Sequence, residues 1–206
     1  MIKVCGLRRN QDIEYANILK PDYIGFIFAK SKRQITTNEA IDLKKLLDKN
    51  IKTVGIFVNE DLENILDIAE SVGLDVVQLH GDEENMYIDE LRKGMGLRKI
   101  NPEIWKAIRV KNKDSLELLE QIKVDGILLD TYSKEAYGGL GETFDWSIVS
   151  GLKLDKKIIL AGGLDKENVE SAKKIVKPDI IDVSSGIETD GFKDYEKMKS
   201  FIERGR

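Results

Sequence analysis

Short apolar runs alternate with longer stretches in which apolar residues recur at helical spacing. A run rich in β-branched residues that stops at a glycine or a polar residue is typical of a buried strand. Eight such runs are predicted, at residues 1–6, 23–28, 52–58, 75–80, 104–110, 125–129, 157–161 and 180–183. The first run begins at Met1 and ends at Gly6.

The stretches between these runs predict helices. Their ranges are 13–19, 37–47, 61–72, 82–93, 114–122, 165–176 and 194–204, with at most a short helix at 145–149. Pro21 would end the first helix, and Thr37 or Asn38 could cap the second. Residues 94–99 are expected to form a loop before the fifth strand, and residues 130–143 a long glycine-rich loop.

This alternation is the pattern of a single-domain (β/α)8 TIM barrel, an α/β fold, over residues 1–206. Its first strand would pair with both the second and the last. A doubly wound open sheet is the alternative, disfavoured because no strand leads through a Gly-x-Gly-x-x-Gly turn into a helix. Trp105 and Trp146 are expected to pack between helices and barrel.

Polar residues inside strands that are buried on both faces need an explanation. Side chains alternate across a strand, so Lys3 shares a face with Cys5, and Gln78 with His80. If these faces point inward, four side chains lie at the end of the barrel where such folds carry out their chemistry: Cys5, His80, Asp130 and Asp182. Lys3 would lie one layer deeper, where it could equally form a buried ion pair with Asp182 that merely fills the interior.

Each candidate also has a purely structural interpretation. Cys5 could be a small buried hydrophobe, and as a base it would need a nearby cation to lower its pKa. Asp130 could be a working carboxylate or a turn former. His80 could be a hydrogen-bonded structural histidine. Arg33 resembles other surface arginines, although its guanidinium would suit a carboxylate ligand.

Composition narrows the class of protein. The 206 residues are 41% hydrophobic and 34% charged, as in ordinary soluble domains. The net charge of −4 is scattered, so no nucleic-acid or membrane-surface partner is expected. A single cysteine and the lack of a signal or transmembrane segment suggest a reducing cytoplasm. One His and one Cys also argue against a His/Cys metal site.

Glycine-rich turns follow the last three predicted strands. They are Gly138-Gly139-Leu140-Gly141, Ala161-Gly162-Gly163 and Ser184-Ser185-Gly186. In this fold the loops after strands seven and eight commonly bind phosphate through backbone N–H groups. The alternative is that these glycines only make tight turns. The clustering in adjacent units favours a phosphorylated small-molecule substrate.

Nine short motifs are spread along nearly the whole chain. They are Lys3-Val4-Cys5-Gly6-Leu7, Gly25-Phe26-Ile27-Phe28, Ser31-Lys32-Arg33, Val54-Gly55-Ile56-Phe57-Val58, Val77-Gln78-Leu79-His80-Gly81, Leu128-Leu129-Asp130, Phe144-Asp145-Trp146, Leu160-Ala161-Gly162-Gly163-Leu164 and Asp182-Val183-Ser184-Ser185-Gly186-Ile187-Glu188. Each motif alone is weak, but nine in this order are specific, and together they resemble the phosphoribosylanthranilate isomerase family of tryptophan biosynthesis.

The resemblance implies a cofactor-free, cytoplasmic barrel enzyme, monomeric or homodimeric, that performs an Amadori rearrangement. It implies that Asp130 is the general acid, that Cys5 is the general base, and that Arg33 holds the anthranilate carboxylate. The implied substrate-binding residues also include His80, Gly139, Gly141, Gly162, Gly163, Asp182, Ser184, Ser185 and Gly186.

Two positions depart from the family pattern. Arg8 and Leu140 stand where many members have threonine, which puts in doubt any hydroxyl contact at these rim positions. Arg8 could instead add positive charge near an anionic substrate. The rival functions are another sugar-phosphate barrel, such as indole-glycerol-phosphate synthase or a histidine-pathway isomerase, and a non-catalytic barrel that binds a phosphorylated ligand. A histidine-pathway isomerase would be expected to carry Asp at position 5.

Overall fold

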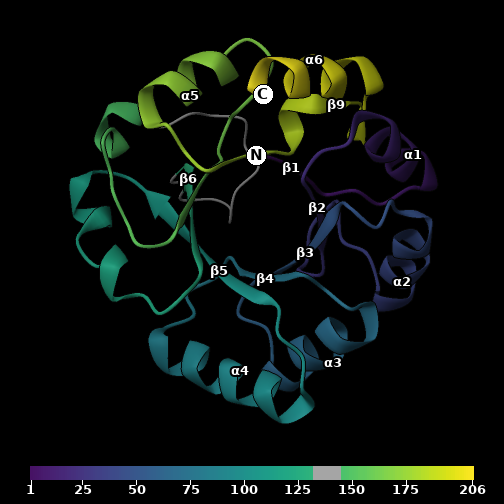
Figure 1. Ribbon diagram of the computed structural model, residues 1–206, viewed down its shortest axis with the longest axis vertical. Helices are drawn as coiled ribbons and strands as arrows, with labels where there is room; N and C mark the ends of the chain where they lie inside the picture. The colour runs from purple at the N-terminus through teal and green to yellow at the C-terminus, as the bar shows by residue number, and fades with distance from the viewer. Residues whose placement is uncertain (132–144) are drawn as a thin grey trace.

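The computed structural model describes residues 1–131 and 145–206. Its eight parallel strands close into a barrel in chain order (Figure 1). They are β1 (Ile2–Cys5), β2 (Tyr23–Ile27), β3 (Lys52–Phe57), β4 (Val76–Leu79), β5 (Glu103–Val110), β6 (Gly126–Thr131), β7 (Lys157–Leu160) and β8 (Ile180–Val183). Lys3 is in register with Tyr23 of β2 on one side and with Asp182 of β8 on the other. The predicted (β/α)8 barrel, closed through its first strand, is confirmed.

Helices surround the barrel (Figure 1). Among the described residues the α-helices are α1 (Asn10–Leu19), α2 (Thr37–Leu46), α3 (Leu62–Val72), α4 (Asn85–Arg98), α5 (Val169–Val176) and α6 (Tyr195–Gly205). Four 3-10 turns complete the set: η1 (Lys113–Leu116), η2 (Leu119–Gln121), η3 (Trp146–Val149) and η4 (Ser185–Ile187). The single helix predicted over 114–122 is therefore wrong, since two 3-10 turns take its place. None of the described helices is long and apolar enough to span a membrane.

Helix α4 corrects the loop that was predicted at residues 94–99. The helix continues through Arg98 and ends at Lys99, which adopts a left-handed φ of 57°. Ile88, Leu91 and Met95 are all buried, so the apolar stripe of the helix extends past Gly94. Burial of this stripe outweighs the low helix propensity of the two glycines in the last turns.

The hydrophobic core has two parts, one inside the barrel and one between barrel and helices. Trp105 belongs to the inner part, contrary to the prediction, and is fully buried. Its ring contacts that of Tyr23 edge to face at 5.1 Å, and its Nε1–H donates to Glu103 Oε2 at 2.9 Å. Period-two alternation decides the direction, because Trp105 shares a face with the inward Ala107. Trp146 packs in the outer part, as predicted.

Four aspartates tie the strands together where the strands begin. Each precedes an even-numbered strand and accepts a hydrogen bond, through its carboxylate, from the backbone N–H of the preceding odd strand. The pairs are Asp22 with Ile2 (2.7 Å), Asp75 with Thr53 (2.7 Å), Asp125 with Ile104 (2.7 Å) and Asp179 with Ile158 (2.8 Å). The backbone N–H of each aspartate donates to the carbonyl of that same partner residue.

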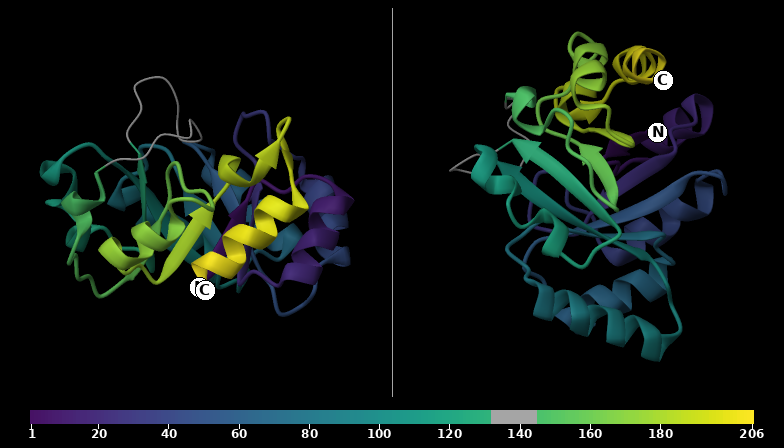
Figure 2. Two further views of the ribbon diagram at one scale, coloured as in Figure 1. Left: turned by 90° about the horizontal axis from the view of Figure 1, so that it is seen from above. Right: turned by 60° about the vertical axis from the view of Figure 1, so that its left-hand side comes forward.

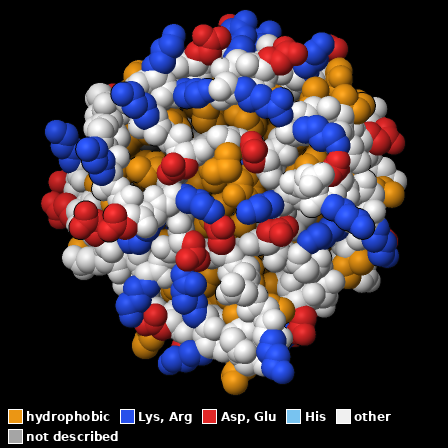
Figure 3. Space-filling model, viewed as in Figure 1, with side chains coloured by type: hydrophobic (Ala, Val, Ile, Leu, Met, Phe, Trp, Pro, Cys, Tyr) orange, Lys and Arg blue, Asp and Glu red, His pale blue; other side chains and the backbone are white. Residues whose placement is uncertain are grey.

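The carbonyl of each aspartate then reaches the next odd strand. It accepts from the N–H of Lys52, Glu103, Lys157 and, across the closure of the barrel, the amino group of Met1, respectively. We call these four residues the aspartate ring. Figure 3 looks onto the face where the chain begins and shows acidic and basic side chains interspersed around a hydrophobic centre. This end of the barrel is therefore closed by the hydrogen bonds of the aspartate ring.

A small hairpin between β8 and α6 was not predicted. Its strands are β9 (Glu188–Thr189) and β10 (Phe192–Lys193). Figure 2 shows it in yellow, beyond the N-terminal end of α6. The hairpin has only two residues in each strand, too few for hydrophobic periodicity to reveal.

Candidate active site

Lys3 and Asp182 form an ion pair inside the barrel. Lys3 Nζ lies 2.6 Å from Asp182 Oδ2, and the Lys3 side chain is fully buried. Burial alone would lower the pKa of Lys3, but the Asp182 carboxylate outweighs this and raises it. The other carboxylate oxygen, Oδ1, is buried without a hydrogen-bond partner among the described residues. The ion pair therefore leaves one acceptor of Asp182 available to a ligand.

Cys5 ends β1, two residues beyond Lys3 and on the same inward face. It is 7% exposed, and burial raises the pKa of its thiol above the ordinary value of 9.0, although the Lys3 ammonium opposes the shift. Cys5 is therefore a thiol in the free protein at neutral pH. The cation that its use as a base would require is present, as the sequence suggested, but it does not overcome burial.

A chain of hydrogen bonds connects Gln78, His80 and Asp130. Gln78 Nε2 lies 2.9 Å from His80 Nδ1, and His80 Nε2 lies 3.2 Å from Asp130 Oδ2. The second Asp130 oxygen accepts from the backbone N–H of Thr131 at 2.7 Å. The inward direction predicted for these residues is found, and His80, which directly follows β4, meets Asp130 of β6 across β5.

Two glycines after β7 and β8 allow close backbone approaches. Gly162 has a φ of +86°, and a Cβ there would lie 2.8 Å from Asp130 Oδ1 and 2.7 Å from the Thr131 nitrogen. A Cβ on Gly186 would lie 2.0 Å from the carbonyl oxygen of Leu164. Any other residue would clash at these positions. The loop after β7 is thus packed against Asp130 on one side and against the loop after β8 on the other.

Arg33 is held by a residue to which the sequence assigned no role. Its Nε and Nη2 donate to the two carboxylate oxygens of Glu188, each at 2.7 Å. Glu188 also accepts from Lys193 Nζ at 2.7 Å. Burial alone would raise the pKa of Glu188, but Arg33 and Lys193 together lower it to about 2. Glu188 ended one of the family motifs, whereas nothing in the sequence marked Lys193 as buried.

Lys193 joins this ion-pair cluster to the loop after β8. Its Nζ donates to the Ser184 carbonyl at 2.9 Å, and Ser184 Oγ donates to the carbonyl of Cys5 at 3.1 Å. Arg33, Ser184 and Cys5 are thereby brought together by the hairpin. Ser185 and Gly186 lie in η4, directly after Ser184.

Arg8 does not offer a free charge to a ligand. Its guanidinium donates to the carbonyls of Lys32 (2.7 Å) and Gly191 (3.0 Å) and lies 4.6 Å from the centre of the Phe192 ring. It fastens the loop after β2 to the hairpin. Leu140, Gly139 and Gly141 lie outside the described residues, as does most of the loop predicted after Asp130.

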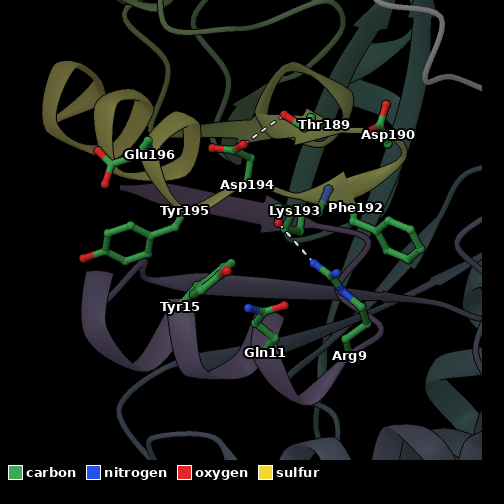
Figure 4. Close-up of a pocket in the computed structure, with 10 residues that line it drawn as sticks. All are labelled: Arg9, Gln11, Tyr15, Thr189, Asp190, Phe192, Lys193, Asp194, Tyr195 and Glu196. Carbon is green, nitrogen blue, oxygen red and sulfur yellow. Dashed lines mark hydrogen bonds between the residues drawn. The ribbon is translucent and has the colours of Figure 1, made fainter.

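A cavity of about 450 Å³ lies between α1 and the hairpin (Figure 4). Arg9 crosses it, stacking 4.4 Å from the centre of the Phe192 ring and donating to the carbonyl of Lys193 at 3.1 Å. Tyr15 and Tyr195 meet edge to face at 5.2 Å. None of the predicted site residues lines this cavity. Its contacts anchor the hairpin on α1.

Within residues 1–131 and 145–206 no group of three or more His, Cys, Asp or Glu side chains could hold a metal ion. The arrangement instead offers a thiol, a carboxylate beside an imidazole, a second carboxylate with one free oxygen, and an arginine. Such a site can move protons and bind anions.

Comparison with known proteins identifies the family. The model of the N-(5'-phosphoribosyl)anthranilate isomerase family matches residues 2–204. The N-(5'-phosphoribosyl)anthranilate isomerase of Thermoanaerobacter pseudethanolicus is 57% identical over 205 residues, which cover 100% of this chain and 97% of that protein.

Solved structures agree. The phosphoribosyl anthranilate isomerase of Thermotoga maritima is 36% identical, with a TM-score of 0.88 and coverage of 99% of this chain and 97% of that one. A phosphoribosyl anthranilate isomerase in complex with reduced 1-(o-carboxyphenylamino)-1-deoxyribulose 5-phosphate is 35% identical, with a TM-score of 0.81 and the same coverage. The chain therefore belongs to the N-(5'-phosphoribosyl)anthranilate isomerase family.

Proposed function

We propose that this protein converts N-(5-phosphoribosyl)anthranilate into 1-(2-carboxyphenylamino)-1-deoxyribulose 5-phosphate in tryptophan biosynthesis. The reaction is an Amadori rearrangement that moves protons only, so that it needs no electron or group carrier. Family membership over the whole chain and the relative bound to a reduced form of that product support the proposal.

Asp130 is the general acid of the proposed mechanism. It protonates the furanose ring oxygen, the bond from C1′ to that oxygen breaks, and the nitrogen lone pair forms the iminium (Schiff base). Asp130 keeps the electron pair and becomes a carboxylate, which the Thr131 N–H and His80 can both contact. A positioned acid of this kind is worth about 10²–10⁴-fold in rate.

Cys5 is the general base. Its thiolate removes the C2′ proton, the electrons of that bond neutralise the iminium, and an enolamine forms that becomes the ketone. Because the thiol pKa is raised by burial, only a minor fraction of Cys5 is the active thiolate at neutral pH. The Lys3 ammonium favours that fraction.

One observation supports this assignment: Cys5, Asp130 and Asp182 lie at or near the C-terminal ends of β1, β6 and β8, which are parallel strands of one closed barrel. The two proposed reacting groups are therefore at the same end of the barrel as Asp182, whose Oδ1 is buried without a hydrogen-bond partner among the described residues. A sugar hydroxyl would satisfy that oxygen.

The two ends of the substrate are anionic, and the site offers cationic or N–H groups for each. Arg33 binds the anthranilate carboxylate through the guanidinium hydrogens that Glu188 leaves free. The backbone of the Gly162-Gly163 and Ser184-Ser185-Gly186 segments holds the phosphate. Since the phosphate is remote from the reacting carbons, its binding energy serves alignment. The Thermotoga maritima relative is described as dimeric, and a homodimer is the quaternary structure to test first.

The experiment is direct. Phosphoribosylanthranilate generated in situ is mixed with the purified protein, and its anthranilate-type fluorescence is followed. Loss of fluorescence at a rate proportional to protein concentration is expected. A protein that binds this substrate without any loss would be a non-catalytic phosphate-binding barrel, and one that turns over only other sugar phosphates would be another barrel enzyme.

A further inference from the structure

Gln78 is a buried polar residue that the proposed mechanism does not use. It lies in the middle of β4, 1% exposed, and is paired in register with Ile56 of β3 and Trp105 of β5. Its amide nitrogen contacts His80 Nδ1 at 2.9 Å. Its amide oxygen has no hydrogen-bond partner within the described part of the chain. Burial of an amide in an apolar interior costs free energy, and here a single hydrogen bond offsets that cost. A buried amide with only one bond therefore calls for an explanation in terms of what that bond does.

The bond from Gln78 determines what His80 can do. An amide nitrogen only donates, so Nδ1 must accept and therefore carries no hydrogen. In the neutral imidazole the hydrogen then resides on Nε2, which lies 3.2 Å from Asp130 Oδ2. His80 is thus a donor to Asp130. If the amide were reversed, its oxygen would accept from Nδ1–H, and a bare Nε2 lone pair would face Asp130.

We infer that Gln78 is a positioning residue for the isomerase reaction, which fixes His80 as the Nε2–H tautomer so that His80 donates to Asp130. The inference rests on the proposed role of Asp130 as general acid. When Asp130 delivers its proton to the ring oxygen, negative charge develops on its carboxylate. Two donors then face the two oxygens, the Thr131 N–H on Oδ1 and the His80 Nε2–H on Oδ2.

Donors aimed at developing charge stabilise the transition state more than the ground state, and they raise turnover rather than substrate affinity. With the other tautomer a lone pair would face the forming carboxylate and oppose proton delivery. Gln78 itself touches no reacting atom. Its whole effect passes through the imidazole.

The chain contains one histidine, so the tautomer can be read without resonance assignment. In protein labelled with ¹⁵N at histidine, long-range ¹H–¹⁵N correlations from the ring C–H protons show which nitrogen carries the hydrogen. The expected result for the ligand-free protein at neutral pH is a protonated Nε2 and a bare Nδ1. A spectrum showing Nδ1–H, or both nitrogens protonated, would overturn the inference.

Kinetics of Gln78→Met test the consequence. This variant has about the same volume but no amide, and the expected outcome is a mixed or Nδ1–H tautomer, a kcat lower by roughly 10-fold to 100-fold and a KM changed by less than about 2-fold. Gln121→Met, in the exposed turn η2, is the matched control and should behave as wild type. An unchanged tautomer together with an unchanged kcat in Gln78→Met would refute the inference.

A second background keeps the test informative if Gln78→Met folds poorly. In His80→Gln the side-chain amide supplies a donor near the Nε2 position that needs no tautomer control. Adding Gln78→Glu should then cost no further kcat, whereas Gln78→Glu alone, which turns an acceptor toward Nδ1, should cost about 10-fold or more. Equal losses in both backgrounds would mean a purely structural role. The NMR readout needs no substrate, so failure of the proposed function would leave it standing.

Discussion

Glu188 occupies one edge of the Arg33 guanidinium, with both contacts at 2.7 Å. A guanidinium presents two edges that can each bind a carboxylate bidentately, and Glu188 uses the Nε–Nη2 edge, which leaves Nη1 and the second Nη2 hydrogen. Lys193 Nζ donates to Glu188 Oε1 and so holds the Glu188 carboxylate in place. The arginine is therefore oriented before a ligand arrives.

We expect Glu188→Gln to weaken binding of the anthranilate-bearing substrate. A Gln side chain can accept from only one guanidinium nitrogen and lacks the charge, and loss of one charge-assisted bond is worth about 1.5–3 kcal/mol. KM should rise about 10-fold or more, with kcat changed by less than about 3-fold. Arg33→Ala should likewise raise KM more than it lowers kcat. Steady-state kinetics decide this, with Glu203→Gln on α6 as the unaffected control. A kcat effect without a KM effect would contradict the positioning role.

Glu188 should also make stability sensitive to acid. Its pKa falls from 4.5 to about 2 on folding. A carboxyl whose folded pKa is depressed contributes stability above its unfolded pKa and loses it as pH falls toward the folded one. Urea unfolding midpoints of the wild type should therefore drop between pH 4.5 and 2, more steeply than those of Glu188→Gln. Parallel curves for the two proteins would disprove this contribution.

Removal of either reacting group should abolish most turnover and leave the fold intact. Cys5→Ala and Asp130→Asn are each expected to lower kcat by at least 10²-fold, the lower limit for a positioned acid or base. Circular dichroism and unfolding midpoints provide the control for folding. A near-wild-type rate in either purified variant would remove that residue from the mechanism.

The raised pKa of Cys5 predicts an alkaline pH dependence. The thiolate is the active base, and burial moves its formation above 9.0, so the active fraction grows about 10-fold for each pH unit below the pKa. kcat/KM should still be rising at mildly alkaline pH. Cys5→Ser, whose hydroxyl does not ionise in this range, should give a much lower kcat/KM that does not change with pH on the alkaline side. A wild-type kcat/KM that already reaches a plateau at neutral pH would mean that another group determines the alkaline pH dependence.

The aspartate ring should be measurable as stability. Asp179→Ala removes the acceptor of the Ile158 N–H, which lies 2.8 Å away, and an unpaired part-buried donor costs about 1–3 kcal/mol. Asp179→Asn retains an acceptor and should recover part of the loss. Asp42→Ala, at an exposed i,i+3 pair, should change the free energy of unfolding by less than about 0.5 kcal/mol. Equal losses at positions 42 and 179 would refute the role of the ring.

The local pattern of apolar and polar residues was sufficient to predict the barrel fold and the side chains that point into the barrel. Strand periodicity of two places Lys3, Cys5 and Gln78 by simple counting, and the structure has them inside. The same counting places Trp105 on the inward face with Ala107, so the prediction that Trp105 packs between helices and barrel was wrong. The continuation of α4 through Gly94 could not be predicted in the same way, because glycine has a low helix propensity and the burial of Met95 is a property of the folded chain.

Long-range pairings are harder to predict from one sequence. The ion pair between Lys3 and Asp182, 179 positions apart, was one of the two interpretations that the barrel allowed for Lys3, and it is found. The contact between Arg33 and Glu188, 155 positions apart, was not predicted. Nothing local distinguishes Lys193 from the solvated lysines around it, since its burial arises from the hairpin and from Glu188. The roles of Cys5, Asp130, Arg33 and the phosphate-loop residues remain predictions that kinetics must test.

The aspartate ring divides the barrel into four two-strand quarters, and each quarter has the same set of hydrogen bonds at its N-terminal end. Each quarter carries its own acceptor for its first strand and a carbonyl for its neighbour. A quarter transplanted from another barrel with an aspartate at the same place would find matching partners on both flanks. The chemistry at the opposite rim could then be exchanged piece by piece while the closure of the barrel stays the same.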